Sequence, residues 1–279
     1  DLSLGATFLG SGGGGSPDYD VLMAEKQVRE YGPAMLADIQ ELQDGDLVVP
    51  IAFGGAPLVG LELLPSGREC DELCELVQAV YGKKPTYLMP AEIGGANALA
   101  PFLYASRLGI PVLDADTIGR AFPEVQMSSC NLHGISPNPS FLIDAMGNSV
   151  IIKAKDAASL ELIARKNIVA MGSSALMGVY LMEGLIAKKA VIPGSISKAI
   201  GIGKTIRLAK ECGENPLKAL GDHYGAEVIG VGIIDEIVQR IDEGFLNGSV
   251  TILNEKESFD IAYQNEYLKV ECAQTIIAV

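Results

Sequence analysis

The sequence predicts an α/β fold, in which a mostly parallel sheet is flanked by helices and is followed by a second α+β domain rich in antiparallel strands. In the first half, apolar strands alternate with helices, and strands that are apolar throughout are typical of a parallel sheet covered on both faces. From residue 227 onward, short β-branched segments separated by turns predict antiparallel pairing. We expect the domains to span residues 1–155 and 156–279.

Local patterns predict the elements of the first domain. A helix is expected to begin at Pro17–Asp18 and to extend to about Tyr31, because proline is favoured near the start of a helix. Apolar residues at helical spacing predict a second helix over Glu69–Tyr81, and Asn97 is a candidate cap for a third that extends to Leu108. Strands are expected at Ala6–Leu9, Ala34–Ile39, Asp46–Phe53, Thr86–Pro90 and Ile110–Leu113, with a hairpin of Ser140–Ile143 and Ser149–Ala154.

The second domain is predicted to begin with helices and to continue as strands. The expected helices are Ala157–Lys166, Ser195–Glu211 and Pro216–His223. The expected strands are Glu227–Ile234, Ser249–Asn254, Ser258–Tyr263 and Leu268–Cys272, with turns at Asn247–Gly248 and Asn254–Glu257. The sequence stops on a strand-like segment, 274–279, so we expect the second domain to be truncated at its C-terminus.

One apolar stretch resembles a membrane span. Ile168–Ala187 contains a single charged residue, Glu183, but Gly172 and two serines interrupt it. We therefore interpret it as a buried strand, a turn and a small-residue helix rather than as a span. The same stretch is a candidate interface for a homo-oligomer.

Composition excludes several partners. The chain has 21 Lys and Arg against 35 Asp and Glu, a formal charge of -14, and it contains no Trp. An acidic surface repels phosphate backbones and anionic lipids, so we expect neither nucleic acid nor membrane as a partner. The five cysteines are an odd number and widely scattered, which is unlike a disulfide framework and favours a cytoplasmic protein.

Four loops at predicted strand ends carry glycine pairs or acids: Gly10–Ser16, Phe53–Pro57, Met89–Asn97 and Leu113–Met127. Open α/β sheets bind ligands at the carboxyl ends of their strands. We therefore expect these loops to line one pocket for a small-molecule substrate.

The glycine-rich loop offers backbone amides to a ligand. Gly12, Gly13, Gly14 and Gly15 precede a helix and are candidate substrate-binding residues; the alternative is a tight turn without a ligand. The run is unlike a dinucleotide fingerprint, because it contains extra glycines and acids follow it. Gly203–Thr205 is unlike the end of a phosphate-binding loop, because Lys198 stands where that motif needs glycine. No nucleotide cofactor is expected.

The acids of the later loops are candidate catalytic residues. Asp114 and Asp116 alternate along a predicted extended chain, so both are expected to face one way. With Glu92 and Glu124 they are suited either to dividing acid and base roles or to binding a hard cation, and Asp114, Asp116 and His133 are the candidate metal ligands. The alternative is an Asp-turn cap.

Other polar residues of these loops have candidate roles in substrate binding. Arg120 is suited to holding a substrate carboxylate or to neutralising the acids, and its structural alternative is a pair with Glu124. Asn97 and Gln126 complete the candidate substrate-binding set. Cys130 is a candidate nucleophile without an evident base.

Three blocks of this sequence resemble those of a known family. They are the segments 8–17, 89–99 and 113–127, and shorter matches lie at 192–197 and 263–267. The chain thereby resembles the S-methyl-thiohydantoin desulfurase-like family, whose members occur beside or fused to hydantoinase/oxoprolinase proteins. The resemblance implies hydrolytic removal of sulfur from a five-membered ring, with a thiol leaving.

Two functions remain open at this stage. The first is a hydrolase of thiohydantoin-like or hydantoin-like rings, in which a divalent metal is one way to activate water. The second is a non-catalytic accessory subunit or binding partner of a hydantoinase-type enzyme, in which the glycine loops are structural.

Overall fold

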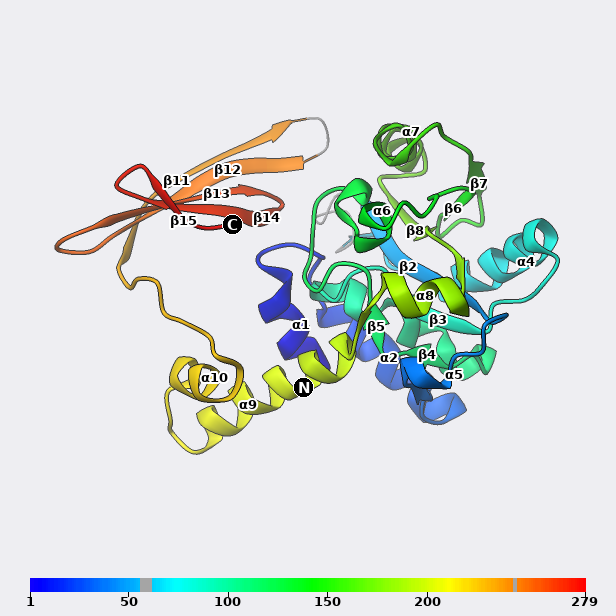
Figure 1. Ribbon diagram of the computed structural model, residues 1–279, viewed down its shortest axis with the longest axis horizontal. Helices are drawn as coiled ribbons and strands as arrows, with labels where there is room; N and C mark the ends of the chain where they lie inside the picture. The colour runs from blue at the N-terminus through cyan, green and yellow to red at the C-terminus, as the bar shows by residue number, and fades with distance from the viewer. Residues whose placement is uncertain (56–61, 243–244) are drawn as a thin grey trace.

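The computed structural model describes residues 1–55, 62–242 and 245–279. These residues form a mixed α/β body around an eight-stranded sheet, together with a separate five-stranded antiparallel sheet near the C-terminus (Figure 1). Helices flank the large sheet. The structure therefore confirms the predicted α/β unit and the predicted antiparallel unit that follows it in the sequence.

The large sheet is parallel on one side and antiparallel on the other. Its order is β1-β4-β3-β2-β8-β6-β7, and β9 also pairs with β2. The pairs among β1, β4, β3 and β2 are parallel, whereas β8, β6, β7 and β9 pair antiparallel. The strands are β1 (Leu36–Ala37), β2 (Leu47–Gly55), β3 (Tyr87–Pro90), β4 (Val112–Leu113), β6 (Ser140–Ile143), β7 (Ser149–Ile152), β8 (Ser174–Gly178) and β9 (Met182–Glu183).

Strand β2 is buried on both faces, which explains its continuous apolar sequence. Val48 packs into a cluster with α7 (Ala157–Ala170) and α8 (Gly184–Ala190). Leu47 and Val49 point to the opposite cluster, which contains residues of α4 (Glu69–Tyr81). The layers on both faces fix the strand ends where the candidate site lies.

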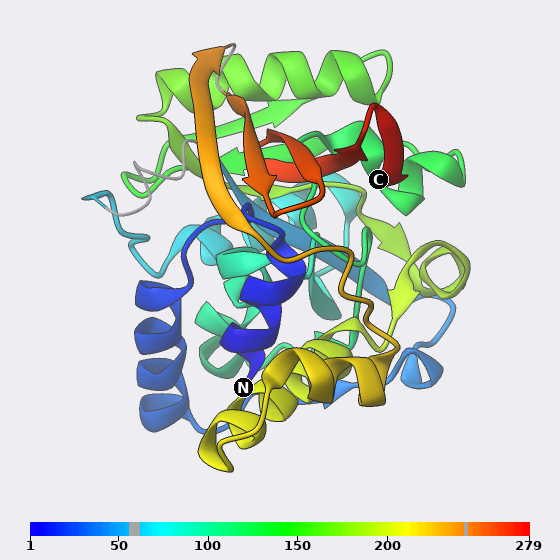
Figure 2. The same cartoon turned by 90° about the vertical axis from the view of Figure 1, so that its left-hand side faces the viewer.

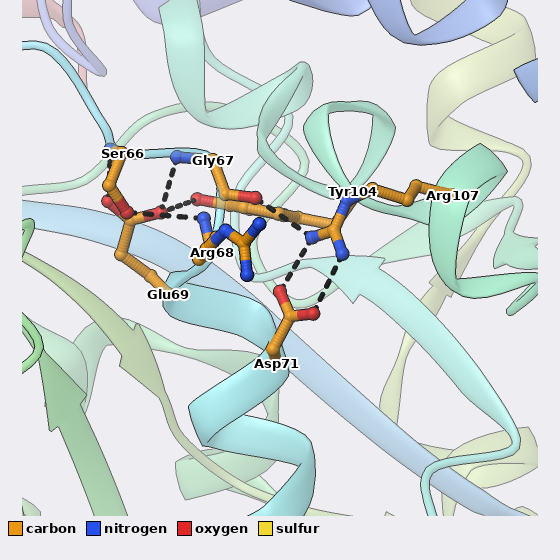
Figure 3. Close-up of polar contacts among 7 residues, drawn as sticks. All are labelled: Ser66, Gly67, Arg68, Glu69, Asp71, Tyr104 and Arg107. Carbon is orange, nitrogen blue, oxygen red and sulfur yellow. Dashed lines mark hydrogen bonds and ion pairs between the residues drawn. The ribbon is translucent and has the colours of Figure 1, made fainter. Parts of the chain in front are cut away.

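Helix α4 has the predicted bounds, and its first turn is anchored by a buried acid. The Glu69 carboxylate accepts hydrogen bonds from the backbone N–H of Ser66 and Gly67, at 2.5 and 3.1 Å, and from the Tyr104 hydroxyl at 3.0 Å (Figure 3). Arg107 holds Asp71 through two hydrogen bonds of 2.7 and 2.6 Å. These contacts fix the segment that precedes the helix.

The predicted strand Ala6–Leu9 is wrong, because these residues belong to helix α1 (Leu2–Gly10). Short apolar runs are ambiguous between strand and helix, and here a tertiary partner decides. Helix α1 lies against α9 (Ser195–Glu211), as Figures 1 and 2 both show. A Cβ at Gly5 would lie 1.8 Å from the carbonyl oxygen of Ala199, so the two backbones touch there.

Two further predictions need correction in the α/β body. Asn97 caps no helix to Leu108; the segment is broken into η2 (Gly95–Ala98), η3 (Ala100–Leu103) and α5 (Ala105–Leu108). Pro101 lacks the N–H that a continuous helix needs there. The strand predicted over Ala34–Ile39 is only the short β1, followed by η1 (Ile39–Glu41), because the Asp38 side chain caps that turn. Helix α2 (Asp18–Tyr31) is as predicted.

The apolar stretch Ile168–Ala187 forms the end of α7, strands β8 and β9 and the start of α8. The buried strand and the later helix are as expected, but the first residues of the stretch belong to a helix instead of a strand. Among the described residues, no helix is both long enough and apolar enough to cross a membrane. Strands β8 and β9 belong to the large sheet, so this sheet contains strands from before and after residue 155. The division of the chain at 155 stays a prediction.

A linking segment leads from α10 (Pro216–Tyr224) to the antiparallel meander. Its strands are β11 (Ile233–Asp242), β12 (Phe245–Leu253), β13 (Ser258–Gln264), β14 (Glu266–Cys272) and β15 (Thr275–Ala278). Two expectations are wrong here: the first strand begins at Ile233 rather than Glu227, and Asn247–Gly248 lies inside β12 rather than in a turn. A Cβ at Gly248 would lie 2.0 Å from the Val238 carbonyl oxygen, so glycine permits a close strand contact.

Short elements complete the fold around the candidate site. Strand β5 (Ala115–Asp116) pairs with β10 (Ile192–Pro193) in a two-stranded sheet. The turn η4 (Val125–Met127) and the helix α6 (Ser129–Leu132) follow β5. The Thr117 N–H donates to the Ala91 carbonyl at 3.1 Å and places the predicted acidic loop beside the carboxyl end of β3.

Replacing Gly5 by alanine should destabilise the protein by about 1–3 kcal/mol, because the added methyl group forces α1 away from the α9 backbone. Urea unfolding measures the change. The matched control is Gly45→Ala, since an added Cβ there meets nothing within 4 Å. Equal unfolding midpoints for the two variants would contradict the close contact.

Candidate active site

A cavity of about 170 Å³ lies at the carboxyl ends of β2 and β3. Segments that are distant in sequence form its walls, among them the glycine-rich loop, the start of α2, the end of β2, the loop after β3, residues 122–123, α7 and the turn between β13 and β14. In Figures 1 and 2 that turn lies beside the loop after α1. The backbone N–H of Tyr267 donates to the Ser11 carbonyl at 2.8 Å and joins the two segments.

Glu92 is the most strongly perturbed acid that lines the cavity. It follows β3 and is only 8% exposed. Burial is the main reason that its pKa is raised to about 8, and the charges of Glu266 and Asp116 act in the same direction. Hydrogen bonds from the Asn97 side chain at 2.7 Å and the Phe122 N–H at 3.0 Å oppose the shift. Burial outweighs them, so the pKa of Glu92 stays well above that of a free carboxyl group.

Asn97 fixes the orientation of Glu92. Its Oδ1 accepts the Phe53 N–H at 2.7 Å, and its Nδ2 donates to the Phe53 carbonyl at 3.2 Å. These bonds attach the side chain to the backbone of β2 and leave the amide N–H to face Glu92. Asn97 therefore lines the cavity. Its side-chain hydrogen bonds connect the Glu92 carboxyl group to the backbone of β2.

Glu266 is the second buried acid of the cavity, and it comes from β14. It is 3% exposed, and its Oε2 has no hydrogen-bond partner. Burial raises the pKa of Glu266 to about 7. Its own backbone, the Gly14 amide and the charges of Arg120 and Arg165 lower the pKa and limit this rise. Glu266 thus lines the cavity with one carboxylate oxygen that no protein group occupies.

The glycine loop is shaped by this acid and by the loop after β3. A Cβ at Gly13 would lie 1.8 Å from Oε1 of Glu266, so a larger residue there would have to displace the Glu266 side chain. Gly14 has a φ of 75°, and its carbonyl accepts the Asn97 N–H at 3.2 Å. Gly15 lines the cavity with Gly14, whereas Gly12 packs near Tyr267 outside it. The loop follows a helix rather than the predicted strand.

Asp116 supports the site from behind. It is fully buried, and one carboxylate oxygen accepts the N–H groups of Ile93, Ile118 and Gly119 at 3.0, 3.2 and 2.7 Å. Burial raises the pKa of Asp116 to about 6 against these bonds. Since Ile93 follows Glu92 directly, Asp116 positions the loop that carries the cavity acid. The contacts of Asp116 with Ile118 and Gly119 are those of an Asp turn, the alternative to a catalytic role.

Asp114 and Asp116 do not face one site, which corrects the expectation from their alternation. Asp114 accepts the N–H groups of Ile196 and Ser197 at 2.9 and 3.0 Å and so caps the start of α9. His133 is exposed and contacts the Ser129 carbonyl through Nδ1 at 2.9 Å. These three candidate metal ligands therefore do not converge. No group of three metal-ligating side chains occurs in the part of the chain that the structure describes.

The remaining candidates lie around the cavity rather than inside it. Arg120 donates to the carbonyl oxygens of Tyr267 and Ala121 and stacks on Phe122, so it joins the two sheets instead of pairing with Glu124. Glu124 accepts hydrogen bonds from Gln126 and, at 3.0 Å, from Gln264. Of the loop Phe53–Pro57, residues 56 and 57 lie outside the described part of the chain.

Cys130 is buried, and burial raises the pKa of its thiol to about 11. The thiolate is therefore scarce at neutral pH, and a nucleophilic role for Cys130 is disfavoured.

Three charged residues of the cavity were absent from the predicted set: Glu266, Asp20 and Arg165. Arg165 binds Glu161, donates to the Pro123 carbonyl at 3.3 Å and lies 3.8 Å above the ring of Phe245. Burial raises the pKa of Asp20, in the first turn of α2, to about 6. The family block at 263–267 was the one available signal for Glu266. Asp20 was visible only as one of the acids that follow the glycine run, and no sequence pattern marked Arg165.

Comparisons with known proteins agree with this architecture. Residues 1–154 match the family described as S-Me-THD-like, N-terminal domain, and residues 154–279 match its C-terminal domain. The chain therefore belongs to the S-methyl-thiohydantoin desulfurase-like family, as its sequence blocks predicted.

The fold is also similar to a crystal structure of a protein from Chromobacterium violaceum. The TM-score is 0.77 at 22% identity, and the match covers 100% of this chain and 77% of that one. At this identity the likeness concerns the fold alone. No curated protein matches the sequence.

The raised pKa of Glu92 makes stability depend on pH. Between about 4.5 and about 8 the folded protein keeps a proton on Glu92 that the unfolded chain has released, so the free energy of unfolding falls as pH rises. One such group contributes on the order of 1 kcal/mol per pH unit. Urea unfolding from pH 5 to 9 should show a shallower fall for Glu92→Gln. Exposed Glu75→Gln is the control, and equal slopes would contradict the buried proton.

Replacing Glu266 by glutamine should lower the pKa of Glu92 from about 8, because a neighbouring negative charge is removed. Carbon-detected NMR titration of the Glu92 carboxyl group measures this shift. The control is Glu183→Gln on β9, whose exposed carboxylate pairs with Lys83. An unchanged Glu92 titration in Glu266→Gln would show that the two acids do not interact.

Proposed function

We propose that the protein is a hydrolase that removes a thiol from a cyclic S-alkyl thiohydantoin, leaving a hydantoin-type ring. Family membership supports the substrate class. The observation that carries the proposal is a pair of buried acids, Glu92 and Glu266, that line one cavity with pKa values of about 8 and about 7. Acids with displaced pKa values can divide acid and base roles near neutral pH.

In the first step, ionised Glu266 accepts a proton from water as the water oxygen bonds to the ring carbon between the two nitrogens. The electron pair of the C=N bond moves to nitrogen and leaves a tetrahedral carbon. Arg165 lines the same cavity and is the cation that can stabilise this developing charge. Glu266 suits the base because its free oxygen has no protein partner.

In the second step, the carbon–sulfur bond breaks and the sulfur takes the proton of Glu92. The thiol leaves, and the new C–O bond becomes a carbonyl group as its hydroxyl proton passes to the ring nitrogen. Transfer of the proton from Glu266 to Glu92 restores the starting state. One water is consumed, and one thiol and one ring carbonyl are formed, with no change in oxidation state.

No step of this mechanism passes through a metal. The predicted ligand set does not fit one, because Asp114 caps α9, the bonded oxygen of Asp116 accepts three amides, and His133 is exposed. The same contacts make Asp116→Asn a poor test of catalysis, since it disturbs the support of the loop.

The test is thiol release from S-methyl thiohydantoins, followed with a thiol-reactive dye. We expect kcat to fall at least 100-fold in both Glu92→Gln and Glu266→Gln, and the wild-type rate to rise and fall with pH around 7 to 8. Glu75→Gln should keep wild-type activity. Folding is checked by circular dichroism. No thiol release by the folded wild type would favour the accessory-subunit function instead.

A further inference from the structure

A second cavity of about 130 Å³ adjoins the first and shares part of its wall, including Glu92, Asn97 and Phe122. We infer that this second cavity, the apolar lobe, receives the S-alkyl group during the reaction and restricts the substrate to thiohydantoins with an uncharged, compact substituent on sulfur. The inference rests on the proposed function and extends it to substrate specificity.

The wall of the lobe away from Glu92 is mainly apolar. Ala52, Ala164, Ile168, Met177 and Val179 line it, from β2, α7, β8 and the residue after β8. These side chains belong to the core under the large sheet or pack against it. A small apolar group that enters the lobe therefore leaves water for an apolar surface, which favours its binding.

The polar groups of the lobe are already paired. Glu161 binds Arg165 and accepts the Val125 N–H at 3.0 Å, and the Tyr180 hydroxyl donates to the Val125 carbonyl at 3.2 Å. Glu124 accepts hydrogen bonds from Gln126 and Gln264. A charged substituent in the lobe would meet two carboxylates, with only Arg165, itself bound to Glu161, as a cation. The loss of water around the charged substituent would therefore not be offset by new hydrogen bonds, and its binding would be disfavoured.

The two acids give the reaction a direction. Glu266 lines only the first cavity, whereas Glu92 lines both. Water activated by Glu266 therefore reaches the ring carbon from the first cavity, and the sulfur that takes the proton of Glu92 leaves toward the lobe. This arrangement gives the attacking water and the leaving sulfur separate spaces around the ring carbon.

The size of the lobe limits the substituent. A volume of about 130 Å³ corresponds to about four water molecules, at roughly 30 Å³ each. Methyl to propyl groups fit this space, whereas a benzyl group overfills it. We therefore expect similar rates for S-methyl and S-propyl substrates and a fall in kcat/KM of at least tenfold for S-benzyl.

The first test compares S-propyl with S-carboxymethyl thiohydantoin, which are similar in size and differ in charge. The wild-type protein should process the charged substrate at least 100-fold more slowly, measured as kcat/KM by thiol release. Values within threefold of each other would overturn the inference, as would an S-benzyl rate equal to the S-methyl rate.

The second test enlarges the lobe with Met177→Ala. This variant should raise the ratio of S-benzyl to S-methyl kcat/KM at least tenfold. The matched control is Met182→Ala, which truncates a buried methionine of the same core cluster that does not line the lobe. Equal ratios in the two variants would overturn the inference.

A milder variant covers the case in which Met177→Ala fails to fold. Val179→Ala also widens the lobe, and it should shift the same ratio by at least threefold; no shift would count against the lobe. The two levels of proposal remain distinguishable. Absence of thiol release from every substrate refutes the proposed function, whereas release without discrimination among S-substituents refutes only the role of the lobe.

Discussion

The site depends on one close contact, in which the Glu266 carboxyl group lies against the backbone of Gly13 and Gly14. A side chain at Gly13 would overlap Glu266, and the Gly14 amide lowers the pKa of that acid against the effect of burial. The contact brings the antiparallel sheet to the cavity of the α/β body, and Tyr267 and Arg120 hold it there. The glycine run therefore binds a carboxyl group of its own chain.

In the acids of the cavity, burial raises the pKa more than hydrogen bonds lower it. Glu92 accepts two hydrogen bonds, which favour its charged form, and yet its pKa lies at about 8 because the group is desolvated and acids surround it. Asp116 accepts hydrogen bonds from three backbone N–H groups, and its pKa is raised only to about 6. Besides burial, neighbouring acids raise the pKa of Glu92, whereas the three amide donors limit the rise at Asp116.

Patterns confined to one element were sufficient for much of the fold. The helix Glu69–Tyr81, the hairpin of β6 and β7 and the central strand β2 all follow from apolar periodicity and local turns. The sequence predictions fail where distant backbones touch. The apolar run of α1 predicts a strand because its partner α9 lies almost 200 residues away, and Gly248 predicts a turn because its close neighbours are on β11 and β13.

The fold class, the family and the loops that carry glycines and acids follow from residue type and short-range spacing. Which acids share the cavity depends on long-range packing. Asp114 leaves it to cap α9, whereas Glu266 enters it from a strand that begins 174 residues after Glu92. The physical reason is that a shifted pKa requires burial among charges from several segments, and no local pattern specifies which segments meet.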